Sequence, residues 1–244
     1  MTTSATRPIV KQVFGSHDYP TRDGRPSDSD MHRQVMIDAI ETLEAFYAGQ
    51  QVYVTGNLLL FYQPGDRRRH LSPDVMVVKG APPGIRLNYL LWEEGHSPNV
   101  VIEITSPSTR NEDLKKKFEI YRDVIRVSEY FLFDPIDEYL SPRLQGFRLV
   151  GDQYVPVEMV AGRLPSLELG LELEADESQL RLYHPDNGHW LPNLPEMQRA
   201  AEQAKHRAEA AKLRAEAAKL RAEEDNARLR REIDELRQRL AGGK

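Results

Sequence analysis

The sequence contains no cysteine among its 244 residues, which excludes disulfides, thiolate metal ligands and cysteine nucleophiles. Proteins of a reducing compartment commonly have this composition. The N-terminus lacks the basic start and the apolar run of a signal peptide. The apolar runs, such as residues 58–62, are far shorter than the ~20 residues that span a bilayer. We therefore expect a cytoplasmic protein that does not cross a membrane.

Positive charge is scarce in the first 195 residues. The whole chain holds 33 Lys and Arg against 38 Asp and Glu, and 13 of the basic and 10 of the acidic residues lie from Glu196 onward. Residues 1–195 therefore hold 20 basic and 28 acidic side chains, a net charge of −8. Because non-specific DNA binding depends on neutralising phosphates, a nucleic-acid site in this part must be a local basic patch.

The composition divides the chain into three parts. Residues 1–27 are polar and rich in proline and glycine, and we expect an irregular arm. Residues 28–187 alternate between helical and strand patterns, which predicts one domain of the α/β class with a mixed sheet. From residue 195 to residue 241, Ala, Glu, Lys, Arg and Leu dominate, which predicts a C-terminal coiled-coil helix.

The α/β part begins with a helix. Helix-start residues at 27–30 precede an apolar stripe that runs to Tyr47 at helical spacing, and Gly49 follows as a stop. A helical pattern at residues 111–122 lies between two strand patterns, and this order predicts a parallel crossover. The strand patterns are residues 51–55, 57–62, 74–78, 100–104, 129–133, 146–150, 153–157 and 180–183.

Two acidic residues adjoin apolar strands. Glu103 lies inside the run of residues 100–104, which is typical of a strand buried on both faces. A carboxylate there is costly unless it is paired or binds a cation. Asp74 opens another apolar strand directly after Pro73. Two converging carboxylates and a backbone carbonyl would suit Mg²⁺ or Mn²⁺, which prefer oxygen ligands.

Each of these residues also has a purely structural interpretation. Asp74 is then a strand-start or turn residue. Glu103 forms a buried ion pair, for which Arg110 and Lys117 are the candidate partners. Lys117 forms an exposed pair with Asp113 one helical turn earlier.

Four segments together resemble the Uma-two family of restriction endonuclease-like proteins, within the PD-(D/E)XK nuclease superfamily. The segments are SPDVMVV at 72–78, VIEITSPST at 101–109, DLKKKFEIY at 113–121 and EYFLFDP at 129–135. The resemblance covers roughly residues 15–185. It implies a restriction endonuclease-like core, in which helices flank a mixed sheet.

The resemblance implies roles for individual residues. Asp74 matches the Asp of the superfamily motif, and Glu103 matches its second acid. The motif lysine usually lies two residues after that acid, where this chain has Thr105. In the resembled family the lysine comes from the following helix, and Lys117 matches its position.

The first helix is a second source of site residues in the superfamily. Many members have an acid there, and Asp28 and Glu41 are the candidates in this chain. His32 resembles a histidine that is common near the start of this helix. We interpret it as a capping or packing residue.

The resemblance predicts a metal-dependent endonuclease that hydrolyses DNA phosphodiester bonds. Asp74, Glu103 and the Ile104 carbonyl would hold Mg²⁺ or Mn²⁺, which would activate a water molecule. Lys117 would orient that water and offset charge on the phosphate. The candidates for phosphate contacts are Arg67, Arg68, Arg69 and Arg110, and a solvated turn is the alternative interpretation of residues 67–70.

A non-catalytic protein is the alternative, because a fold does not establish a function. Such a protein would keep the nuclease scaffold and would self-associate or bind partners through the C-terminal helix. The acidic charge of residues 1–195 and the presence of Thr105 favour this alternative.

The C-terminal helix contains a seven-residue repeat, since AAKLRAE occurs at residues 210–216 and again at 217–223. Two apolar seams follow from the sequence, and a local stutter must separate them because their registers differ. The first seam holds Ala210, Leu213, Ala217 and Leu220, and the second holds Asn226, Leu229, Ile233, Leu236 and Leu240. The seams predict a homo-oligomer in which Asn226 can fix the register. The alternative is a single solvated helix with Glu–Lys and Glu–Arg pairs.

Overall fold

The structure is a computed structural model that describes residues 13–14, 18, 29–106, 112–138 and 140–241. The chain divides into two compact units between Leu194 and Pro195. The described part of the second unit is helical and belongs to α3 (Leu194–Ala241), a helix of 48 residues that begins at the last residue of the first unit. None of the helices in the described ranges is long and apolar enough to cross a membrane.

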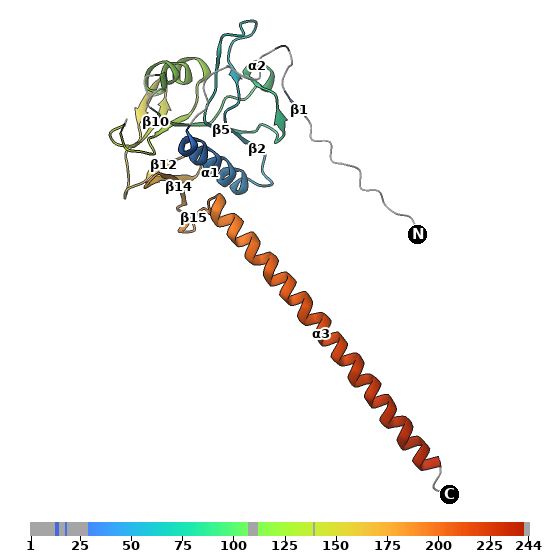
Figure 1. Cartoon of the computed structure of the whole chain (residues 1–244). Coiled ribbons are helices and arrows are strands. Elements are labelled where there is room, and N and C mark those ends of the chain that lie inside the picture. Colours follow the sequence, from blue (N-terminus) through green and yellow to red (C-terminus); the bar gives the residue numbers. More distant parts are fainter. Residues whose placement is uncertain (1–12, 15–17, 19–28, 107–111, 139, 242–244) are drawn as a thin grey trace. The chain divides into compact units, whose positions relative to one another are not determined.

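A six-stranded mixed sheet lies at the centre of the first unit (Figure 1). In spatial order its strands are β11 (Gln153–Pro156), β10 (Leu144–Val150), β9 (Glu129–Phe133), β8 (Val100–Ile104), β5 (Val75–Lys79) and β2 (Val52–Thr55). β8 and β9 are parallel, and the other neighbouring pairs are antiparallel. The predicted mixed sheet and parallel crossover are therefore confirmed.

One face of this sheet is covered by α1 (Asp30–Phe46) and by a second, antiparallel sheet. The Ser29 hydroxyl caps α1 by accepting a hydrogen bond from the His32 backbone N–H at 3.2 Å. Leu43 of α1 packs in one cluster with Ile102 of β8. The second sheet consists of β12 (Leu164–Ser166), β13 (Leu171–Asp176), β14 (Gln179–His184) and β15 (His189–Trp190).

The opposite face is covered by the helical crossover and a small sheet. The crossover consists of two π-helical stretches, η1 (Glu112–Lys117) and η2 (Ile120–Ile125). The small sheet consists of β3 (Leu60–Phe61), β4 (His70–Leu71) and β7 (Tyr89–Leu90). Tyr121 packs against Val101 in this layer. Because side chains alternate along a strand, Glu103 faces the crossover as Val101 does.

The remaining elements are short. β1 (Val13–Phe14) pairs in parallel with β6 (Ile85–Arg86), and α2 (Leu91–Glu94) follows β7. The predicted arm of residues 1–27 therefore contains a two-residue strand, which its polar composition does not indicate.

Most predicted strands match within one or two residues at each end, and two predicted elements differ more. The strand expected at residues 57–62 is reduced to β3, because Asn57 has a φ of 51°, which interrupts an extended strand. The helix expected at residues 111–122 continues to Ile125 and is π-helical.

Candidate active site

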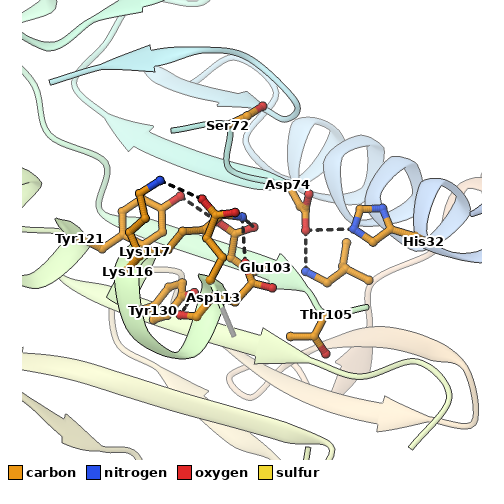
Figure 2. A network of polar contacts seen from close by, with 12 residues as sticks. His32, Ser72, Asp74, Glu103, Thr105, Asp113, Lys116, Lys117, Tyr121 and Tyr130 are labelled. Carbon is orange, nitrogen blue, oxygen red and sulfur yellow. Dashed lines mark hydrogen bonds and ion pairs between the residues drawn. The ribbon is translucent and has the colours of Figure 1, made fainter. Parts of the chain in front are cut away.

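Asp74 directly precedes β5, and Glu103 lies in β8, the antiparallel neighbour of β5. The last pair in register between these strands is Val75 with Ile102, so Asp74 and Glu103 are the residues that follow this pair at the ends of the two strands. The Ile104 backbone N–H donates to Asp74 Oδ2 at 2.7 Å, which fixes the carboxylate at the strand end (Figure 2).

Both oxygens of the fully buried Glu103 accept hydrogen bonds. Lys117 Nζ donates to Oε2 at 2.8 Å, and the Tyr121 hydroxyl donates to Oε1 at 2.7 Å. Lys117 Nζ also lies 2.9 Å from Oδ1 of Asp113, one helical turn earlier. Figure 2 shows these side chains converging from the crossover helix onto β8. Lys117 thus contacts Glu103 directly, whereas Asp74 accepts a hydrogen bond from the Ile104 N–H.

His32 approaches Asp74 from the first turn of α1. Its imidazole Nε2 lies 3.1 Å from Asp74 Oδ2, and the side chain is buried. The Ser29 cap holds the backbone of His32, so the start of α1 sets the position of the imidazole. Four parts of the chain therefore form the candidate site: α1, β5, β8 and the crossover helix.

The electrostatics of the site follow from three carboxylates that share one lysine. Burial raises the pKa of Glu103 well above its usual value, and although the charge of Lys117 opposes this shift, those of Asp74 and Asp113 add to it. Burial alone would also raise the pKa of Asp74, but the hydrogen bond with His32 and the charge of Lys117 hold it below its usual value. The site has an excess of negative charge that a cation would offset.

Lys117 remains protonated in this environment. Burial lowers the pKa of an ammonium group, but the charges of Glu103 and Asp113 hold the pKa of Lys117 above its usual value. The side chain is therefore a fixed positive charge and not a general base.

The donor set fits a hard divalent cation in chemistry and in charge. The Asp74 and Glu103 carboxylates and the Ile104 carbonyl are oxygen ligands of the kind that Mg²⁺ and Mn²⁺ prefer. Both described hydrogen bonds to Asp74 are accepted by Oδ2. Within the described ranges, no group of three or more His, Asp and Glu side chains could hold a metal ion. A third protein ligand would therefore be the backbone carbonyl.

Other predicted site residues lie elsewhere. Thr105 is buried, but its hydroxyl donates to the Phe133 carbonyl at 3.2 Å and does not join the acidic cluster. Glu41 is exposed on α1. It lies nine residues after His32, which is about 13.5 Å along the helix, and it therefore does not reach Asp74. Asp28 and Arg110 lie outside the described residues.

The predicted phosphate-binding arginines lie on the turn between β3 and β4. Arg67, Arg68 and Arg69 are exposed, and the Arg68 guanidinium donates to both oxygens of Asp66, at 3.0 and 3.2 Å. This turn borders a cavity of about 350 Å³, which is lined by Tyr62, Asp66, Arg68, Arg69, His70 and Lys116. Because Lys116 is adjacent to Lys117 in the chain, the cavity adjoins the helix that carries the candidate lysine.

The sequence indicated His32 only as a capping or packing residue and Asp113 only as an exposed partner of Lys117, and it did not indicate Tyr121 as a site residue. Asp113, Lys117 and Tyr121 are spaced four residues apart, so a polar stripe on one helix face was an available signal. For His32 there was no comparable signal, because its contact with Asp74 joins residues 42 positions apart.

Gly56 determines the position of the Asp74 backbone. A Cβ at residue 56 would overlap the Asp74 carbonyl oxygen and would lie 2.6 Å from Ile40 Cδ1. We expect Gly56→Ala to displace Asp74, to weaken divalent-cation binding at least tenfold, and to lower the free energy of unfolding by about 1–3 kcal/mol. Calorimetry and urea denaturation measure these effects. Gly162→Ala is the control for metal affinity, because a Cβ there has no neighbour within 4 Å, although its φ of +84° makes alanine cost stability at this position as well. Equal metal affinity in both variants would refute the role of Gly56.

The fold and the site together define a mixed α/β domain with two acids at neighbouring strand ends and a buried lysine on the crossover helix. Residues 24–183 match the family model described as "Uma2: Putative restriction endonuclease". The chain therefore belongs to the Uma2 family, as its four motifs predicted.

One solved structure and the curated proteins complete the comparison. A putative nuclease belonging to DUF820 from Anabaena variabilis ATCC 29413 is similar, with a TM-score of 0.47 and 15% identity over 65% of this chain and 87% of that chain. No curated protein matches the chain.

Proposed function

We propose that this chain is a Mg²⁺- or Mn²⁺-dependent endonuclease that hydrolyses DNA phosphodiester bonds in the cytoplasm. The observation that carries the proposal is the contact of Lys117 Nζ with the buried Glu103 carboxylate at 2.8 Å, with Asp74 directly before the neighbouring strand β5. Membership of the Uma2 family supports the same activity. Asp74, Glu103 and the Ile104 carbonyl would hold the cation, which when bound supplies Lewis acidity and makes water a stronger nucleophile.

The side chains of the site have separate tasks in this proposal. The protonated Lys117 orients the attacking water and stabilises the negative charge that develops on the phosphate. His32 and the Ile104 backbone N–H orient the Asp74 carboxylate, and Tyr121 orients Glu103. Such outer contacts typically change metal affinity or activity by about 10- to 100-fold.

The cavity beside the crossover helix is the proposed contact surface for the DNA backbone. Arg68, Arg69 and Lys116 provide local positive charge in a part of the chain with a net charge of −8. Their present ion pairs are exposed, and such pairs contribute at most about 1 kcal/mol, so a phosphate can replace the carboxylate partners. These contacts position the DNA without reading its sequence.

Metal binding and plasmid nicking test the proposal on the same samples. We expect Asp74→Ala and Glu103→Ala each to reduce nicking about a hundredfold or more and to remove the Mg²⁺ or Mn²⁺ binding that calorimetry detects in the wild type. Glu41→Ala is the matched control, because this acid is exposed on α1 and should leave both properties unchanged.

The opposite outcome would favour the alternative function. A wild type that binds neither ion and does not nick DNA would refute the nuclease proposal. The chain would then be a non-catalytic interaction protein on a nuclease scaffold, and α3 would be its partner-binding segment.

A further inference from the structure

The apolar seam residues of α3 are exposed along the helix. Leu213 is 67% exposed, Leu229 51% and Leu236 57%. Regularly spaced exposed leucines on a 48-residue helix indicate an interaction surface, which a partner would cover. The charged residues that border the seams indicate what that partner is.

The seam residues occupy heptad positions a and d, and this fixes which flanking residues occupy positions e and g. Ala210 and Ala217 occupy position a of the first seam, with Leu213 and Leu220 at d. In the second seam, Asn226 and Ile233 occupy a, with Leu229 and Leu236 at d. With these assignments, five acids at g positions each precede an arginine at the following e position: Glu202 and Arg207, Glu209 and Arg214, Glu216 and Arg221, Asp225 and Arg230, Glu232 and Arg237. The g position before Leu240 is Arg239.

These charges do not pair within one helix. The acid and the arginine of each g–e set are five residues apart, whereas side chains on a helix meet at spacings of three or four. The ion pairs that the structure describes within α3 have these shorter spacings, such as Asp225 with Arg228 at 2.9 Å. The five-residue spacing therefore needs another explanation.

A parallel pair of helices explains the spacing. In a parallel coiled coil, a g residue faces the e residue that follows five positions later in the partner. Each of the five g acids would then meet an arginine of the partner. In an antiparallel pair, g residues face g residues and e residues face e residues, so acids would meet acids and arginines would meet arginines. The charge pattern favours parallel pairing and opposes antiparallel pairing.

The seam residues indicate the number of strands. A β-branched residue at a with leucine at d favours two strands, and a single Asn at a fixes the register. The second seam has Ile233 and Asn226 at a, with Leu229 and Leu236 at d. The g–e charge rule holds on both sides of the register change, so one partner satisfies both seams.

We propose that α3 pairs with α3 of a second copy of this chain as a parallel, in-register, two-stranded coiled coil. Because α3 follows directly on the first unit, this pairing tethers two copies of the candidate active site at the same end of the coil. Tethering of this kind produces effective concentrations in the millimolar range. If the proposed nuclease function holds, on which this consequence rests, one particle can cut both strands of a duplex in one encounter.

Sedimentation equilibrium of the full chain tests the strand number, and introduced cysteines test the direction. We expect twice the monomer mass at micromolar concentration. Because the chain has no cysteine, Ala210→Cys and Ile233→Cys each introduce a single thiol. Both variants should form disulfide-linked dimers under mild oxidation, since in-register parallel pairing places each thiol beside its copy. Monomers, trimers, or dimers that do not cross-link would overturn the proposal.

Charge reversal tests the g–e contacts without altering the seam. Arg207→Glu, Arg214→Glu and Arg221→Glu combined should produce a monomer, and so should Glu202→Lys, Glu209→Lys and Glu216→Lys combined. An equimolar mixture of these two variants should recover the dimer mass, because each acid again faces a base. Failure of the mixture to associate would refute the assigned contacts.

The proposed dimer and the proposed nuclease function can be refuted independently. A cross-linkable dimer that does not cleave DNA would refute only the nuclease function. A monomer that cleaves DNA would refute only the coiled coil.

Discussion

Lys117→Met is expected to abolish metal-dependent cleavage and to lower the free energy of unfolding by about 3–5 kcal/mol. Lys117 Nζ lies 2.8 Å from Glu103 and 2.9 Å from Asp113, and all three side chains are buried. The substitution leaves two buried carboxylates without the cation that they share. Urea denaturation followed by circular dichroism measures the loss of stability, and plasmid nicking measures the loss of activity.

The loss of stability in Lys117→Met should shrink as the pH falls. The pKa of Glu103 is already raised above its usual value of 4.5, and the substitution removes the attraction to Lys117 that limits this shift. A carboxyl with a raised folded-state pKa stabilises the fold below its unfolded pKa, and this contribution is lost as the pH rises through the folded-state pKa. The difference from the wild type should therefore be smallest near pH 4.5 and should widen toward neutral pH.

Lys115→Met is the matched control, because Lys115 is exposed on the same helical stretch. Its free energy of unfolding should change by no more than about 0.5 kcal/mol, and its nicking activity should be retained. If Lys117→Met behaved like Lys115→Met, the buried cluster would contribute neither to stability nor to chemistry.

The central part of the candidate site could be predicted from the sequence because burial makes an ionisable residue conspicuous. An acid within the apolar run of β8 has few explanations other than a counter-ion or a metal, and Glu103 has the first of these in Lys117. The structural interpretation of Lys117 as a partner of Asp113 also applies, although the pair is buried and not exposed. One residue can thus form both predicted contacts.

The contacts of His32 and Tyr121 could not be predicted in the same way. His32 reaches Asp74 because α1 packs across the strand ends, and Tyr121 reaches Glu103 because the crossover covers the opposite face. Both contacts depend on how layers pack, whereas sequence periodicity reports only which face of an element is apolar. The interpretation of His32 as a capping residue identified its helix but not its partner.

In the fold, long buried strands could be predicted from the sequence, whereas very short strands could not. The buried strands β5, β8 and β9 have enough apolar residues to be predicted within one residue of their bounds. Two-residue strands such as β4 have too little pattern for prediction. The π-helical form of the crossover was also missed, because apolar spacing does not distinguish hydrogen bonds to the fourth residue from those to the fifth.

Glu94→Gln is expected to lower the free energy of unfolding by about 3–5 kcal/mol, although Glu94 lies outside the candidate site. Arg86 is fully buried at its side chain, and its guanidinium donates to both Glu94 oxygens at 2.7 and 2.9 Å. The guanidinium also lies 3.8 Å from the centre of the Tyr53 ring. Loss of the carboxylate charge leaves a desolvated cation. The Tyr53 ring and the Pro82 and Gly84 carbonyls, to which the guanidinium also donates, do not offset the cost of burying it.

Asp152→Asn provides the matched comparison for this prediction. Asp152 also pairs with an arginine, Arg126, at 2.8 Å, but the Asp152 side chain is 87% exposed, and the expected change is below about 1 kcal/mol. Equal changes in Glu94→Gln and Asp152→Asn would contradict the inference that burial, and not distance, determines the contribution of an ion pair.

Glu94 lies on the connection between β5 and β8, at whose ends the candidate metal ligands lie. Folded Glu94→Gln should nevertheless retain its metal affinity, because Asp74 is fixed at the strand end by Ile104 and His32 and not by this connection.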